Sequence, residues 1–237
     1  MLVKTKAIVI SALRYQEKSL VVKCYTESDG LKSYYVRDAF STKKSSQKNI
    51  YFRPLTILEI EAAHKNKGTL EYFKEVRLAH QYLTLTTDIT KTTIALFISE
   101  MLHNSIKEEE KNQSFYHFLE TALLWLDSHD EAANFHLILL LEVTKFLGFY
   151  PDSSQQEYPF FEMTEGIFIP YQSISCISAH ETTLLRRLMP LKFDNSGKAF
   201  HVSERQALLK ILLNYYALHM DGFRQPKSLE VLREVFS

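Results

Sequence analysis

The spacing of apolar residues changes near residue 80, and this change limits the folds that the chain can adopt. Before it, short runs rich in β-branched and aromatic residues alternate with turn signals. Such runs occupy residues 7–13, 20–26, 31–37, 51–61 and 69–76. Five short strands would leave open edges in a flat sheet, so we expect them to close into a small barrel. Gly30 and Gly68 mark turns, and residues 41–49 should form an exposed polar loop.

After residue 80 the apolar residues follow the helical period. Helices are predicted over residues 93–106, 115–126, 132–149, 179–189, 204–220 and 228–236. The third is apolar on most faces and should be the central buried helix. Capping boxes that start at Ser178 and Ser203 are expected to begin the next two. The result is an α+β fold.

The predicted boundaries follow from this change of period. We expect a barrel domain over residues 1–79 and a mostly helical domain over residues 80–237. The second should carry a small irregular hairpin insertion near residues 152–177, turning at residues 164–166.

Charge is distributed unevenly between these halves, although 28 Lys and Arg balance 28 Asp and Glu overall. Residues 1–80 hold 15 cations against 8 acids, and the remainder holds 13 against 20. A basic half attracts polyanions such as nucleic acid. The alternative is ordinary compositional scatter.

Motifs of catalysis are missing from the sequence. It holds no glycine-rich phosphate loop and no nucleophile elbow, and its nine histidines show no metal-ligand spacing. We therefore expect no catalytic residues and no metal. A hydrolase whose site is assembled from distant residues remains an alternative. Cys24 and Cys176 are expected to be buried free thiols, and the lack of a long apolar stretch predicts a cytoplasmic protein without a membrane span.

The segment from Lys32 to Arg53 is the most distinctive. This segment contains six cationic residues and only one acidic residue, Asp38, and aromatic residues are interleaved with them. Exposed aromatic rings can stack on bases, and cations can neutralise phosphates. Strand alternation allows only one of Tyr34 and Tyr35 to be exposed. We assign most of these aromatics to the barrel core and the clustered cations to binding, the alternative being that the lysines only keep a loop soluble.

The sequence resembles the RecO family of DNA repair proteins. The similarity lies in six short segments that keep the family's order: TKAIVI, RYQEKSLVV, YTESDGL, PLTILEI, LGFYP and PKSL, at residues 5–10, 14–22, 25–31, 54–60, 147–151 and 226–229. The resemblance implies an N-terminal OB-fold and a C-terminal helical domain. It also implies a recombination mediator that binds single- and double-stranded DNA and anneals complementary strands.

The resemblance further implies partners. Such a protein would work with RecR, contact the acidic C-terminal tail of single-stranded DNA-binding protein (SSB), and help load RecA onto SSB-coated single strands. It would be cytoplasmic and associated with the nucleoid. Many family members carry a four-cysteine zinc site after the LGFYP segment. Residues 152–158 hold no cysteine, so we expect no zinc here, with the aromatic residues of the hairpin stabilising it instead.

Two sets of candidate binding residues result. The predicted phosphate contacts are Lys6, Arg14, Arg37, Lys43, Lys44, Lys48 and Arg53. An apolar groove with nearby cations for the SSB tail is predicted at Lys145, Phe146 and Phe149 or at Arg186 and Arg187. The alternative is a protein-binding adaptor whose barrel makes no direct DNA contact.

Overall fold

The computed structural model describes residues 2–40, 49–65, 69–107, 110–195 and 199–236. The chain divides into two units, Met1–Ser128 and His129–Ser237, and each is described by itself. The first unit contains the barrel and two helices. The second contains the remaining helices and a short hairpin.

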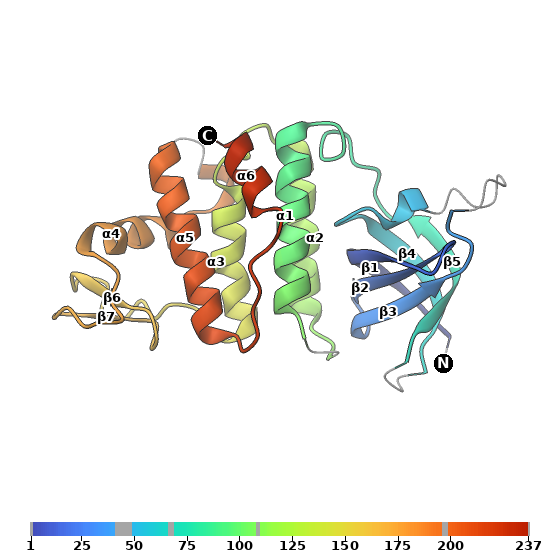
Figure 1. Cartoon of the computed structure of the whole chain (residues 1–237), viewed down its shortest axis with the longest axis horizontal. Coiled ribbons are helices and arrows are strands. Elements are labelled where there is room, and N and C mark those ends of the chain that lie inside the picture. The colour runs from blue at the N-terminus through green and yellow to red at the C-terminus, as the bar shows by residue number, and fades with distance from the viewer. Residues whose placement is uncertain (1, 41–48, 66–68, 108–109, 196–198, 237) are drawn as a thin grey trace. The chain divides into compact units, whose positions relative to one another are not determined.

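Five strands close into the predicted barrel (Figure 1). They are β1 (Leu2–Tyr15), β2 (Ser19–Thr26), β3 (Gly30–Val36), β4 (Ile57–Ala63) and β5 (Glu71–Leu78). Their order is β1-β2-β3-β5-β4, and β1 pairs with both β2 and β4 to complete an OB-like closure. All pairs are antiparallel except β3 with β5. The fold class expected from the sequence is confirmed.

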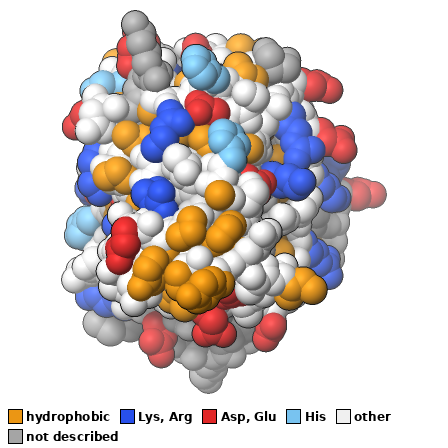
Figure 2. Space-filling view, turned by 90° about the vertical axis from the view of Figure 1, so that its left-hand side faces the viewer, with side chains coloured by type: hydrophobic (Ala, Val, Ile, Leu, Met, Phe, Trp, Pro, Cys, Tyr) orange, Lys and Arg blue, Asp and Glu red, His pale blue; other side chains and the backbone are white. Residues whose placement is uncertain are grey.

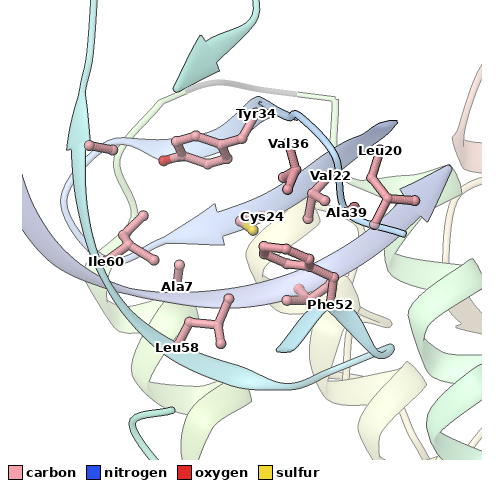
Figure 3. Close-up of a cluster of buried hydrophobic side chains, with 12 residues drawn as sticks. Ala7, Leu20, Val22, Cys24, Tyr34, Val36, Ala39, Phe52, Leu58 and Ile60 are labelled. Carbon is pink, nitrogen blue, oxygen red and sulfur yellow. The ribbon is translucent and has the colours of Figure 1, made fainter. Parts of the chain in front are cut away.

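The barrel interior is filled by alternate side chains of the strands and by one inserted aromatic ring. Tyr34 stacks on Phe73 with ring centroids 4.1 Å apart, and Phe52 also stacks on Phe73 with centroids 5.6 Å apart. Figure 3 shows Tyr34, Cys24 and Phe52 pointing into this interior. Cys24 is fully buried, and burial raises the pKa of its thiol.

One predicted strand was placed wrongly. Residues 51–56 were expected to be extended, but β4 begins only at Ile57. Pro54 has no N–H to donate to a ladder, and Leu55 takes a positive φ of 60°. The chain bends here so that Phe52 enters the core, and the Leu55 N–H donates to the carbonyl of Val9 at 2.8 Å.

The two helices of the first unit are α1 (Ile89–Ser105) and α2 (Gln113–Ser128). The Ser99 hydroxyl of α1 donates to the Ile10 carbonyl of β1 at 2.6 Å, which ties α1 to the barrel. The buried Asp127 carboxylate, at the end of α2, accepts the backbone N–H groups of residues 83, 84 and 85, which connect the barrel to α1. This arrangement, called here the Asp127 latch, satisfies three donors with one side chain.

The second unit is built from α3 (Phe135–Leu147), α4 (Ala179–Leu188), α5 (Val202–His219) and α6 (Leu229–Val235), with a short 3-10 turn at Phe193–Asn195. Nearly all of α3 is buried, as predicted. The capping box at Ser178 is confirmed, but the one at Ser203 is wrong. Instead α5 begins two residues earlier than predicted, and Glu204 accepts the His201 N–H at 2.8 Å.

The hairpin of β6 (Phe160–Glu162) and β7 (Ile167–Ile169) packs through aromatic rings. Phe161 and Phe168 are buried against each other, and Phe161 also contacts Tyr215 of α5. Figure 2 views the molecule from the left-hand side of Figure 1. On this face hydrophobic side chains gather in one area, and elsewhere Lys and Arg are interspersed with Asp and Glu. No helix among the described residues is long and apolar enough to span a membrane.

Candidate nucleic-acid interface

Cations on one side of the barrel are neutralised by carboxylates. Lys4 lies opposite Glu61 and Lys6 opposite Glu59 in the β1–β4 register. Lys74 of β5 also binds Glu61. Lys6 additionally pairs with Glu120 of α2 at 2.9 Å, and Arg77 pairs with Glu75 at 2.6 Å. These groups surround an open hollow of about 400 Å³, lined by Lys4, Thr5, Lys6, Glu27, Glu59, Ile60, Glu61, Glu75 and Arg77.

The ion pairs of this region shift the pKa values of Glu61 and Lys6 toward their charged forms. The hydrogen bond from Lys74 lowers the pKa of Glu61 below its usual value, and burial only partly opposes it. In the same way the hydrogen bond to Glu120 raises the pKa of Lys6. A general acid of a hydrolase needs the opposite shift, so this hollow gives no support to a discontinuous hydrolytic site. The predicted phosphate contact at Lys6 has its charge compensated by α2.

Cations without a carboxylate partner among the described residues lie at the end of the barrel where β1 and β3 end. Arg14, Arg37 and Arg53 are all exposed there. Arg14 lies over the ring of Phe40 at 5.2 Å and donates to a backbone carbonyl, that of Glu17. Within the described residues, no carboxylate pairs with any of these three guanidinium groups.

Packing explains why these arginines emerge together. Arg14 is the strand partner of Leu20, Arg37 follows Val36, and Arg53 follows Phe52. Leu20, Val36 and Phe52 belong to one buried cluster (Figure 3), so the neighbouring arginines surround the same end of the barrel. The predicted contacts Lys43, Lys44 and Lys48 lie outside the described residues. Lys32 points into the barrel and is buried, so it does not belong to the exposed cations.

A buried polar chain at the barrel's interior involves a histidine. His64 Nε2 lies 2.7 Å from the Tyr34 hydroxyl, and His64 Nδ1 lies 3.0 Å from Asp29 Oδ2. Such a chain resembles an acid–base relay. Tyr34 has no exposed surface, however, and its ring is enclosed by the core, so the arrangement serves to satisfy buried polar groups.

Aromatic residues divide between the interior and the surface of the barrel. Tyr34 points inward and Tyr35 outward, so only one of the two is exposed, as strand alternation predicted. Tyr35 lies between two half-exposed rings, Tyr15 of β1 and Tyr72 of β5. Neither Tyr15 nor Tyr72 belongs to the binding residues predicted from the sequence. Outward alternation on β5 was the available signal for Tyr72, but its proximity to Tyr35 depends on the parallel β3–β5 pairing.

The candidate partner-binding residues of α3 lie at its C-terminal end. Lys145 pairs with Glu142 at 2.7 Å and lies over the Tyr150 ring at 4.4 Å. Phe146 is partly buried. Phe149 stacks face to face on His219 with centroids 5.2 Å apart, so its ring is engaged within the unit.

The second candidate pair lies on α4. Arg186 donates to the Tyr158 carbonyl at 2.6 Å, and Arg187 pairs with Glu204 at 2.6 Å. Arg187 also lies over the ring of Phe200. Both arginines therefore hold neighbouring segments of the second unit, and their role toward a partner stays a prediction.

Comparisons with known proteins match both parts of the chain. The family model described as "Recombination protein O N terminal" matches residues 1–82, and the one described as "Recombination protein O C terminal" matches residues 86–230. The proteins named DNA repair protein RecO are similar over their full length and over all of this chain. The identity is 68% for Flavobacterium psychrophilum, 63% for Flavobacterium johnsoniae and 42% for Christiangramia forsetii.

Proposed function

The chain belongs to the RecO family of DNA repair proteins, and from that premise we propose that its barrel binds single- and double-stranded DNA and anneals complementary strands. The observation that supports this most is the group of exposed arginines, Arg14, Arg37 and Arg53, which lack carboxylate partners among the described residues. Cations of this kind neutralise phosphates and release counterions, which favours binding without regard to sequence.

The mechanism requires binding alone. Two complementary strands repel each other through their phosphates, and a basic surface that holds both lowers this repulsion while bases search for partners. Further binding residues are proposed at Lys6, Lys43, Lys44 and Lys48. The barrel would thus act as a mediator, without catalysing bond formation or cleavage.

Partner proteins are the second part of the proposal. We propose that the chain works with RecR and binds the C-terminal tail of SSB, helping to load RecA onto SSB-coated strands. The tail would need cations beside an apolar groove. Lys145 with Phe146 and Phe149, or Arg186 with Arg187, remain the candidates, although the cations already have partners within the unit.

Salt-dependent binding tests the DNA interface. Affinity for a fluorescent single strand is measured by anisotropy over a range of salt concentrations for the wild type and for Arg14→Ala/Arg37→Ala/Arg53→Ala. Each lost phosphate contact on a single strand lowers the slope of log affinity against log salt by about 0.7, so the slope should fall by up to about 2. The matched control, Lys74→Ala/Arg77→Ala, removes two cations that each pair with a carboxylate of their own, Glu61 and Glu75, and should keep the wild-type slope.

The outcomes separate DNA binding from the adaptor alternative. An unchanged slope in the triple arginine variant would remove this end of the barrel from the interface. Wild-type protein that binds no DNA at low salt would favour a protein-binding adaptor. Replacing Lys43, Lys44 and Lys48 by Glu tests these three predicted contacts in the same assay. A strand-annealing assay with and without SSB tests the mediator role.

A further inference from the structure

A row of three tyrosines crosses the outer surface of the barrel. Tyr15 ends β1, Tyr35 lies on β3 and Tyr72 lies near the start of β5. The ring centroids of Tyr15 and Tyr35 are 6.1 Å apart with an interplanar angle of 85°, and those of Tyr35 and Tyr72 are 5.9 Å apart at 72°. Tyr15 is 48% exposed and Tyr72 is 53% exposed, whereas Tyr35 is half-buried.

The central ring is held in place by the barrel. Tyr35 and Tyr72 are direct partners in the parallel β3–β5 pairing, so the backbone fixes their separation. The Tyr35 hydroxyl lies 2.9 Å from Ser19 Oγ at the start of β2, which fixes the tilt of its ring. Edge-to-face contacts then orient the two outer rings against Tyr35. The outer rings are therefore preorganised before any ligand arrives.

This row contributes nothing to the filling of the barrel. A separate inward stack of Tyr34, Phe73 and Phe52 occupies the core. Two aromatic rings that are half exposed on a strand surface are poorly explained by core packing. The row also crosses strands β1, β3 and β5, with Ser19 of β2 beneath it, and the surface over the second and third strands is where OB-folds hold oligonucleotides.

The positive charges next to the row of tyrosines favour a ligand that carries both negative charges and exposed aromatic rings. Arg14 directly precedes Tyr15, and Arg37 lies two residues after Tyr35. These are the guanidinium groups that lack carboxylate partners within the described part of the chain. A single strand offers both phosphates for the arginines and unpaired bases whose faces can stack on tyrosine. In a duplex the bases are already stacked and paired, so their faces are not available to tyrosine, whereas the phosphates remain available to the arginines.

We propose that Tyr15 and Tyr72 stack on unpaired bases of a single strand, with Tyr35 as the ring that positions them. The row then sets the preference of the barrel for single over double strands, while the arginines supply affinity for both. This inference rests on the proposed DNA-binding function and adds the residues that recognise unpaired bases.

Substitution of the outer rings tests the proposal. Affinities for a single strand and for a duplex of the same length are compared for Tyr15→Ala/Tyr72→Ala, Tyr15→Phe/Tyr72→Phe and the wild type. Loss of each stacking ring should weaken single-strand binding about tenfold, and duplex binding should stay unchanged. The phenylalanine variant should bind like the wild type, because stacking needs the ring and not the hydroxyl. Tyr171→Ala, which removes a tyrosine that is 81% exposed in the second unit, is the matched control.

A second measurement uses the wild-type protein alone and so does not depend on the folding of a variant. Wild-type protein is titrated with a strand of normal bases and with an abasic strand of equal length, at several salt concentrations. The abasic strand should bind more weakly, with the same salt slope, because it keeps every phosphate and loses only the stacking surfaces. In the same way the alanine variant should lower affinity without flattening the slope, unlike the arginine variant.

The outcomes distinguish the two proposals. Equal affinity for normal and abasic strands, together with alanine variants that bind single strands like the wild type, would overturn stacking while a strong salt slope kept the DNA-binding function. A wild type that binds neither kind of DNA would overturn both. A double alanine variant that binds DNA normally but loses binding to RecR or SSB would show that the row contacts a protein, which also overturns the stacking proposal.

Discussion

Removal of the Asp127 carboxylate should destabilise the first unit strongly. Its Oδ1 accepts the N–H groups of Thr84 and Leu85, each at 2.8 Å, and both oxygens lie near the Leu83 N–H at 3.0–3.1 Å. The residue is 4% exposed, so water does not readily replace it. In Asp127→Ala three backbone donors lose a charged acceptor at once. Hydrogen bonds to charged groups are worth roughly 1.5–3 kcal/mol each, and partial entry of water reduces their sum to about 3–5 kcal/mol.

Fluorescence of the only tryptophan makes this loss measurable. Trp125 lies on α2 two residues before Asp127 and therefore reports on the first unit, which matters because a two-unit chain need not unfold in one step. Urea unfolding followed by this signal should show the loss in Asp127→Ala. The control Glu17→Ala, which removes an exposed acid of the same unit, should lose no more than about 0.5 kcal/mol. A loss below about 1 kcal/mol in Asp127→Ala would refute the assigned role of the latch.

The contribution of the latch should also depend on pH. Burial alone would raise the pKa of the Asp127 carboxyl, but the backbone donors outweigh it and lower the pKa below its ordinary value. A depressed pKa in the folded state means that the stabilisation is present above the unfolded value, about 3.9, and disappears as the pH falls through the folded value. The difference in unfolding free energy between wild type and Asp127→Ala should therefore shrink on acidification below about pH 4. A difference that is independent of pH would contradict the charged form.

Three further predictions concern single residues. Gly166→Ala should lower stability by about 2–3 kcal/mol in calorimetry, because φ is +68° and an added Cβ would lie 2.3 Å from the Tyr215 hydroxyl; a neutral effect would mean that the hairpin moves freely from α5. Native protein should react with a thiol reagent at Cys176 and not at Cys24, which is fully buried, until urea is added; rapid labelling of both would contradict the closed barrel. Ser178→Ala should cost about 1 kcal/mol in chemical denaturation through loss of the α4 cap, and no loss would show that the cap is dispensable.

Local signals were sufficient to predict most elements of the fold. The turn before Gly30 follows from a residue that accepts positive φ, and the cap at Ser178 follows from its spacing to Glu181. The strand expected at residues 51–56 failed because its apolar residues looked extended, whereas Phe52 is drawn into a core formed by distant strands. The thiols were correctly predicted to be free, but Cys176 is only partly buried.

The binding residues were harder to predict because pairing partners lie far away in the sequence. Lys6 and Arg14 are both cations of β1, but Lys6 lies opposite Glu59 of β4 and pairs with Glu120 of α2, whereas Arg14 donates to a backbone carbonyl. Likewise, Tyr72 joins Tyr35 through a parallel strand pair that no short-range pattern reveals. Alternation correctly predicted that only one of Tyr34 and Tyr35 would face outward, and the barrel shows that it is Tyr35.

The double pairing of β1 determines the order in which the barrel can assemble. One half of this strand forms a tight hairpin with β2, so Tyr15 finds Ser19 almost at once after synthesis. The other half must wait for β4, since Ile8 pairs with Ile57. Contacts between such distant positions are slow to form, so we expect closure of the barrel to be a late step of folding. Until then the edges of β1 and β3 are open to pairing with other nascent chains, and a slow step here would raise the risk of aggregation.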